Sequence, residues 1–331
     1  MSKKSKRKND VKSSILVLLL IAILLIASTY AWFTSNRTVT VNSLDVNVAA
    51  KNGLQISADG TNWKSTLQKD DLLSANLDAT YKDNKNQLPD TMEPVSTAGG
   101  VTSGNLDLYY GTVEAEGNGY SLKTTKETDA KGTEGRYIAF DVFLKVDATT
   151  KIALTPDSNV KFTDTNTKGL ENAARVALLV EGNQATGTAL STIQAMNGAE
   201  AFGTGTTTHV WEPNYDVHTA AGIANAQSTY GKTTTAGPGA AALPYFGVKK
   251  EITSGVDITK TEADTTNFAQ IDPDYKTTKS NSENYDIFTL SPGITKVRVY
   301  MWVEGQDVDC ENTASGANIQ FNLQFTISDN V

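Results

Sequence analysis

The sequence predicts an all-β protein, an antiparallel β-sandwich of jelly-roll type, and two stretches near its end carry most of that prediction. From Asn318 to Ile327, apolar and polar residues alternate without an error. From Lys296 to Glu304 the same alternation places Arg298, Tyr300 and Trp302 together on the polar face. A strict period of two is typical of an antiparallel strand with one buried and one solvated face. We therefore expect both stretches to be strands of a sandwich.

Earlier segments fit the same fold class. Tyr137 to Val146 alternates over its whole length, and Arg175 to Val180 has the continuous apolar character of a more fully buried strand. Between Thr38 and Val48 the alternation changes phase at Asn42-Ser43, which indicates a β-bulge or a break between two short strands. In the whole of residues 32–331, only Ala189–Met196 suggests a short helix.

Residues 182–284 differ in composition from the rest. They are rich in Thr, Ala, Gly and Asn and include runs typical of loops. Large apolar residues are interleaved with these runs, namely Val210, Trp211, Tyr215, Leu243, Tyr245 and Phe246. We expect a long, loop-rich insertion with a small apolar cluster of its own, within one sandwich domain that spans residues 32–331.

The net charge divides the chain into two parts. The formal charge of the 331 residues is -8, but residues 1–12 alone contribute +5, so the remaining 319 residues carry -13. A body this acidic argues against nucleic-acid binding, which requires a basic face to displace counterions from phosphates.

The basic start is followed by a hydrophobic segment that predicts export. Ile15 to Ala27 is uninterruptedly apolar, and small residues follow it. This is the layout of a secretory signal, and Thr29 and Ala31 would occupy positions -3 and -1 of a cleavage site after Ala31. The stretch from 15 to 33 is also long enough, at ~1.5 Å per residue, to remain as a membrane-spanning hydrophobic helix. Residues 1–31 are thus either a cleaved signal peptide or a signal anchor.

The hexapeptide Thr29-Tyr30-Ala31-Trp32-Phe33-Thr34 resembles the processing region of the camelysin/TasA family. These are Gram-positive surface and matrix-fibre proteins released by a dedicated type I signal peptidase. Residues 137–145, 175–177 and 300–310 are similar to strands and a turn of such proteins. The resemblance implies export to the cell surface or extracellular matrix, with signal peptidase as a processing partner and a role in fibres.

The segment after the expected cleavage site could join one copy to the next. Trp32 to Val48 is apolar, alternating and terminal once the signal is removed. A free strand of this kind can complete the open sheet of a neighbour. We expect Val39, Val41 and Leu44 to be the assembly residues, inserting into another copy or a related subunit. The alternative is that this segment is the first strand of its own sandwich.

An acidic turn near the end of the chain is a weak candidate for a metal site. Asp307, Asp309 and Glu311 alternate in one loop and could offer oxygen ligands to Ca²⁺. In an acidic protein, the simpler interpretation is a solvated turn that follows a strand. The single cysteine, Cys310, could form an intermolecular crosslink or be a reactive thiol, or it could pack as a small apolar group in the core.

Catalytic motifs are missing from the sequence. His209 and His218 could bind a metal with Glu212 or Asp216, but there is no His-Glu-x-x-His motif, and Pro213 disfavours a helix there. The camelysin branch has carried a metallopeptidase label, so a cell-envelope metallopeptidase is kept as a weaker alternative. The main prediction is a non-enzymatic structural protein without cofactors. Its leading rival is a monomeric surface binding module anchored by residues 15–33.

Overall fold

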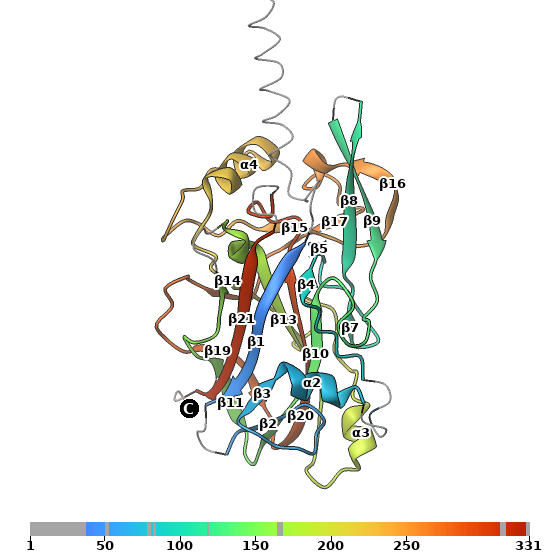
Figure 1. Ribbon diagram of the computed structural model, residues 1–331, viewed down its shortest axis with the longest axis vertical. Helices are drawn as coiled ribbons and strands as arrows, with labels where there is room; N and C mark the ends of the chain where they lie inside the picture. The colour runs from blue at the N-terminus through green and yellow to red at the C-terminus, as the bar shows by residue number, and fades with distance from the viewer. Residues whose placement is uncertain are drawn as a thin grey trace, which may run out of the picture.

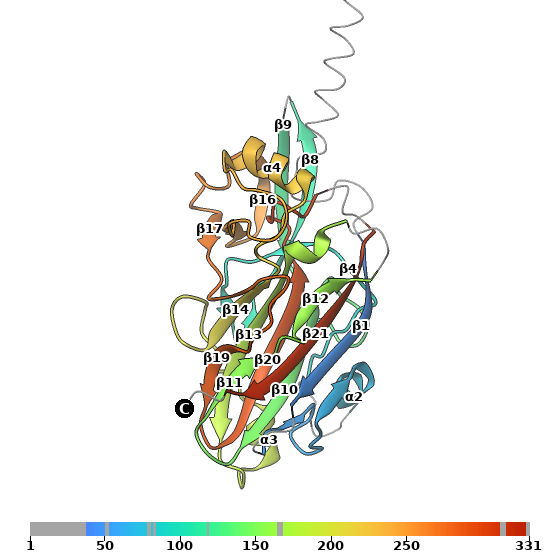
Figure 2. The ribbon, with the colours of Figure 1, turned by 90° about the vertical axis from the view of Figure 1, so that its left-hand side faces the viewer.

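Two large β-sheets form the body of the protein and face one another across a common core (Figures 1 and 2). The structure is a computed structural model that describes residues 38–49, 53–77, 81, 84–117, 119–163, 168–311 and 316–328. The predicted all-β class is confirmed, because strands in mostly antiparallel sheets make up most of the regular structure.

The first sheet has seven strands, with β21 and β1 at its centre. Its main path runs through β19 (Tyr285–Leu290), β11 (Thr150–Leu154), β21 (Asn318–Ile327), β1 (Val39–Val48) and β3 (Thr66–Gln68). Two short strands lie off this path: β12 (Asn159–Phe162) pairs with β21, and β4 (Thr91–Met92) pairs with β1.

The second sheet has six strands and contains the segments with the clearest strand pattern. Its order is β18 (Tyr275–Thr277), β14 (Thr208–Pro213), β13 (Ala174–Gln184), β20 (Gly293–Val303), β10 (Ile138–Val146) and β2 (Gln55–Ser57). The three predicted strands at 137–146, 175–180 and 296–304 are therefore neighbours in one sheet.

Smaller elements cover the ends of the sandwich. A third sheet has the order β16 (Ile252–Asp257), β9 (Gly119–Lys126), β8 (Tyr109–Glu116) and β5 (Val95–Ser96), and the β8–β9 hairpin extends from one end of the body (Figure 1). Two-stranded sheets join β15 (Tyr245–Val248) to β17 (Phe268–Ile271), and β6 (Val101–Thr102) to β7 (Asn105–Leu106).

Short helices complete the described chain. They are α2 (Lys69–Ala75), α3 (Leu190–Gln194), α4 (Ala220–Tyr230) and the 3₁₀ turns η1 (Leu170–Ala173) and η2 (Ile258–Lys260). The helix expected at 189–196 is confirmed as α3. Helix α4 begins where the Thr219 side chain accepts a hydrogen bond from the Gly222 amide, and it ends at Gly231 in the left-handed conformation.

The pairing of β1 with β21 is parallel, which corrects the expectation of a wholly antiparallel sandwich. Val46 lies beside Leu323, and the register shifts between Val41 and Ser43. The phase change at Asn42-Ser43 is thus confirmed as a bulge. It lets Val39 and Leu44 both face the core although an odd number of positions separates them. A second parallel pair joins β14 to β18.

The main core lies between the two large sheets and follows from the alternation in the sequence. Ile319, Phe321, Leu323 and Phe325 enter it from β21, where each is at most 1% exposed. The facing strands β10, β13 and β20 contribute their own alternate apolar residues. Burying each such side chain contributes about 1.5–3 kcal/mol to folding, so this core dominates stability.

The second face of the six-stranded sheet is also buried, contrary to prediction. Arg298 is 4% exposed, and Tyr300 and Trp302 are each 0% exposed. The segment that contains Val95, Leu106 and Leu108 packs over this face, and α3 covers its other end through Ile193. The prediction of a solvated face is wrong because alternation shows which side chains share a face and not what covers it.

Residues 182–284 contribute to the body more than a separate insertion would. Strand β14 lies inside the second sheet, and Val210 and Trp211 belong to the cores on its two faces. Phe246 and Phe268 form an apolar cluster with Leu122, which comes from the β8–β9 hairpin. Of the apolar residues named in the prediction, only Phe246 belongs to this cluster, so the expectation that the insertion has a cluster of its own is wrong.

Candidate functional site

The predicted assembly strand lies in the first sheet of its own chain. Val39 and Leu44 are buried in the main core, and Val41 is partly buried against it. Strand β1 pairs with β21 on one side and with β3 and β4 on the other. The single chain therefore adopts the alternative arrangement, in which this segment is the first strand of its own sandwich.

The predicted signal residues lie outside the described part of the chain. This applies to Thr29, Ala31, the hydrophobic stretch 15–33 and the first residues of the assembly segment, 32–37. Within the described ranges, no helix is long and apolar enough to cross a membrane.

The acidic turn near the end of the chain is buried, so its interpretation as a solvated turn is wrong. Asp307 is 5% exposed, and Asp309 and Glu311 are each 1% exposed. The charge of Asp307 is compensated from another part of the chain. Arg175, on β13, is fully buried, and its Nη2 lies 2.5 Å from Asp307 Oδ2 and 2.7 Å from Glu212 Oε1.

Asp309 ties the same turn to the start of α4. Its Oδ1 accepts hydrogen bonds from the amide and the hydroxyl of Thr219, at 2.8 and 3.0 Å. Its Oδ2 lies 2.8 Å from Nδ1 of His218. The other ring nitrogen of His218 lies 3.1 Å from the Ala241 carbonyl oxygen. A carboxylate and a carbonyl on opposite sides of the ring favour the doubly protonated imidazolium.

The electrostatics of this buried network shift several pKa values. Burial raises the pKa of Glu212 to about 7, against the opposing effect of Arg175, and burial raises the pKa of Glu304 to the same range. Burial opposes a charged His218, but the hydrogen bond to Asp309 and the charges around it outweigh burial and raise the pKa of His218 to about 9. For Arg175 the penalty of burial is outweighed by Glu212 and Asp307, so its pKa lies above its usual range.

The two histidines belong to separate contacts. His209 Nδ1 lies 2.8 Å from Asp274 Oδ2, and its ring stacks on Tyr275. His218 is paired with Asp309, not with Glu212 or Asp216. Among the described residues, no group of three or more His, Cys, Asp or Glu side chains is arranged to hold a metal ion.

Cys310 packs as a small buried group. It is 0% exposed and belongs to the main core. Burial raises the pKa of its thiol well above the usual range, and the neighbouring carboxylates add to the shift. The interpretation as an apolar core residue is confirmed, because a buried and protonated thiol is unreactive.

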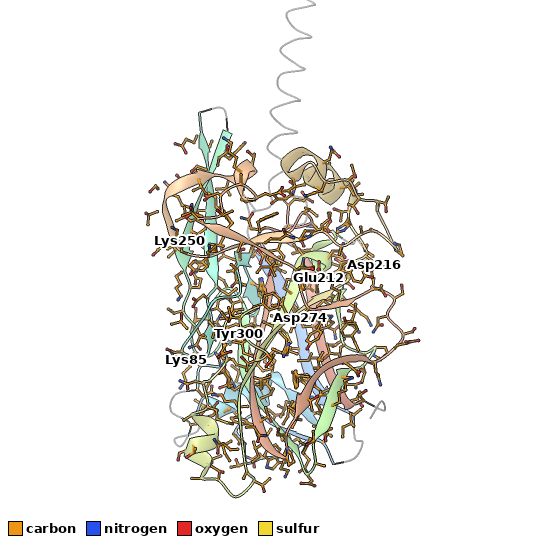
Figure 3. The ribbon with its side chains drawn as sticks, turned by 180° about the vertical axis from the view of Figure 1, so that it is seen from behind. Lys85, Glu212, Asp216, Lys250, Asp274 and Tyr300 are labelled. Carbon is orange, nitrogen blue, oxygen red and sulfur yellow. The ribbon has the colours of Figure 1, made fainter. Side chains whose placement is uncertain are left out.

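A cavity on the covered face of the second sheet is a site that sequence reasoning missed. It measures about 480 Å³, and its charged lining residues are Lys85, Asp141, Glu181, Lys296 and Arg298. The turn between β6 and β7 and the end of α3 form other parts of its wall. Figure 3 shows the molecule from behind and labels Lys85, which lines the cavity, and Tyr300, which lies on β20. The only signal in the sequence is the presence of Asp141, Lys296 and Arg298 within strongly apolar strands.

Comparisons with known proteins give no match for this chain, whether with a family model, a curated protein or a solved structure. The resemblance to the camelysin/TasA family therefore stays a prediction that rests on the quoted residues.

Proposed function

We propose that this protein is an exported structural subunit of a cell surface or extracellular matrix, and that β1 passes from one copy to the next when copies assemble. The observation that carries the proposal is the place of β1. It is the first described strand, it alternates on both sides of its bulge, and its place in the first sheet is beside β21. A strand from another copy that made the same backbone hydrogen bonds would fill the same place.

Energetics determine when such an exchange takes place. Val39, Leu44, Val46 and Val48 are each at most 5% exposed. Withdrawing each from the core costs about 1.5–3 kcal/mol, so a folded monomer releases β1 slowly. The packing that β1 finds in a neighbour replaces the packing it leaves in its own sheet, so the overall exchange is nearly neutral. Assembly is therefore expected during folding, before β1 docks into its own sheet.

The N-terminal prediction belongs to the same proposal. In this proposal the apolar segment 15–33 directs export, and cleavage after Ala31 frees the segment that leads into β1. We also propose that the sandwich has jelly-roll connections. The N-terminal sequence of the cell-associated protein tests the cleavage: a terminus at Trp32 supports it, and an intact Met1 or Ser2 contradicts it.

Cysteine pairing tests strand donation directly. Two full-length versions are co-expressed, one with Asp45→Cys and one with Asn322→Cys, both in a Cys310→Ala background. Asp45 and Asn322 are register partners on β1 and β21. A disulfide between the two chains is expected if β1 is donated. The matched control replaces Asn322→Cys by Gln320→Cys, which pairs with Ser43 and is offset by two residues. Monomers alone, or equal crosslinking in the control, would contradict donation.

A second candidate function is a surface-displayed binding module held by an uncleaved 15–33 helix. The cavity lined by Glu181 and Lys296 favours it, because ligand sites are typically concave and carry a few convergent polar groups. The cell-envelope metallopeptidase remains a weaker proposal that rests on the family resemblance alone, because His209 and His218 belong to separate contacts. Casein hydrolysis that depends on added zinc would support the peptidase, and intact casein under the same conditions would contradict it.

A further inference from the structure

The cavity on the second face of the six-stranded sheet has a built polar interior. Strands β10, β13 and β20 form its floor, and the β6–β7 turn and the end of α3 form parts of its wall. Its volume of about 480 Å³ lies within the range of small-molecule sites. None of its lining residues lies in β1 or β21, so a function of this cavity is independent of strand donation.

A β-bulge places one carboxylate in this cavity. The register between β13 and β20 shifts between Val180 and Gly182, so Glu181 is the extra residue of the bulge. Bulges re-aim side chains and occur often beside functional sites. Gly104 closes over this carboxylate, because a Cβ on Gly104 would lie 2.8 Å from Glu181 Oε2. Glu181 is consequently only 3% exposed although its side chain is ionisable.

The two buried cations of the lining, Lys296 and Arg298, are paired with carboxylates other than Glu181. Arg298 donates to Asp129 at 2.7 Å and to Asp141 at 2.8 Å. Lys296 lies 3.4 Å from Asp141 and donates to the Gln194 carbonyl oxygen at 2.9 Å. Lys85, the third cation of the lining, is exposed. Glu181 forms no ion pair with the described residues.

Two acceptor oxygens in the lining also have no hydrogen-bond partner. Oε1 of Glu181 and Oε1 of Gln194 are buried and accept no hydrogen bond from the described residues. The amide nitrogen of Gln194 donates to the Asp59 carbonyl oxygen at 2.8 Å, which fixes the orientation of the amide and leaves Oε1 as the acceptor. Buried polar atoms of this kind are normally satisfied.

We propose that this cavity binds a small molecule through a primary ammonium group, which donates hydrogen bonds to Glu181 and Gln194. An ammonium supplies both a positive charge that pairs with Glu181 and several N–H donors at one point. A quaternary ammonium has the charge but no donors. A sugar hydroxyl has a donor but does not compensate the charge of Glu181. The carbon part of the ligand would lie against Met196 and Tyr81, which also line the cavity.

The proton affinity of Glu181 supports this choice. Burial raises the pKa of Glu181 to about 7, while Lys296 and Arg298 lower it and Asp141 raises it. A bound ammonium holds this carboxylate ionised. Binding near pH 7 is therefore accompanied by proton release, and it weakens as the pH falls and Glu181 becomes protonated.

Calorimetric titration of the full-length chain in maltoside micelles tests the proposal with butylammonium chloride. Saturable binding is expected, with weaker or no binding of tetramethylammonium and potassium chloride at the same ionic strength. Glu181→Gln should weaken binding by at least about tenfold. Glu283→Gln, which removes an exposed carboxylate, is the matched control and should leave binding unchanged. Nα-acetyl-lysine amide distinguishes the source of the group, since tighter binding than butylammonium would indicate a protein lysine.

The outcomes that overturn the proposal are equally specific. They are no saturable binding up to about 100 mM, a concentration that corresponds to negligible affinity, or equal binding of potassium and butylammonium. Unchanged affinity in a folded Glu181→Gln chain would also overturn it. If that variant does not fold, the unmodified chain still decides the matter: affinity that is constant from about pH 5 to pH 8, without proton release, contradicts a role for Glu181.

Discussion

Arg175 and Asp307 form a buried ion pair, 2.5 Å between Nη2 and Oδ2, although 132 residues separate them in the sequence. Arg175 also donates to the Asn172 and Ala174 carbonyl oxygens and to Glu212. The guanidinium of Arg175, on β13, thus connects the turn after β20 through Asp307 and strand β14 through Glu212. These hydrogen bonds explain how a full charge is accommodated at 0% exposure.

Replacing this arginine should be among the most destabilising changes in the chain. Arg175→Met leaves Glu212 and Asp307 buried without this cation, and we expect the free energy of unfolding to fall by about 3–5 kcal/mol. Urea denaturation followed by circular dichroism measures this. Arg136→Met is the control, because Arg136 pairs with Glu127 near the surface and should change stability by less than about 1 kcal/mol. Equal effects would contradict the role of the buried pair.

Stability should decrease as the pH rises from mildly acidic to alkaline. Glu212 and Glu304 have folded-state pKa values of about 7, raised from 4.5, so the folded state binds more protons and loses stability from about pH 4.5 to 7. His218 has a folded-state pKa of about 9, raised from 6.5. Its contribution is complete below pH 6.5 and is lost as the pH rises through 9.

The contribution of His218 can be isolated by substitution. His218→Gln should remove the part of the decline between pH 6.5 and 9. Thermal melting at a series of pH values provides the comparison. A slope in His218→Gln that equals the slope of the unmodified chain would show that the pair with Asp309 does not govern it.

A close backbone contact holds the smaller apolar cluster against the sandwich. A Cβ on Gly247 would lie 1.9 Å from the Thr97 carbonyl oxygen, and Ala98 donates to the Val248 carbonyl oxygen at 2.8 Å. Gly247→Ala should therefore force β15 away from this segment and cost about 1–3 kcal/mol. A Cβ on Gly187 would meet nothing within 4 Å, so Gly187→Ala should change stability by less than about 0.5 kcal/mol. Similar urea midpoints for the two variants would refute the contact.

Locking β1 in its own sheet should prevent assembly if strand donation is correct. The double variant Asp45→Cys/Asn322→Cys in one chain, with Cys310→Ala, places two thiols on adjacent strands ~4.8 Å apart, which is within disulfide range. Under oxidising conditions, electron microscopy should show no fibres, and reduction before refolding should restore them. Asp45→Cys with Cys310→Ala alone is the control. Fibres formed by the oxidised double variant would refute donation.

The sequence is informative where a pattern is local. The alternation in 318–327 predicts a strand, and the phase change at Asn42-Ser43 predicts the bulge in β1. Both depend only on neighbouring residues. The parallel pairing of β1 with β21 could not be predicted, because alternation is the same in either direction.

Charged residues gave the least reliable predictions. Asp307 and Asp309 resembled a solvated turn because their partners, Arg175 and His218, are far away in the sequence. For the same reason the alternation predicts a solvated face for Arg298, although this residue is paired with Asp129 and Asp141. Glu181 follows a buried strand pattern, and nothing in the sequence indicates that a β-bulge directs its side chain into a cavity.

The neighbouring positions of β1 and β21 also set the timing of folding. Roughly 270 residues separate them, so β1 is synthesised long before its partner. At ~5–20 residues per second, the interval is on the order of 15 to 55 s. During that interval the side of β1 that pairs with β21 has no native partner in the nascent chain, although β3 and β4 can already pair with its other side. Completion of the first sheet is thus a late event, and truncation before residue 318 leaves the central position of this sheet vacant.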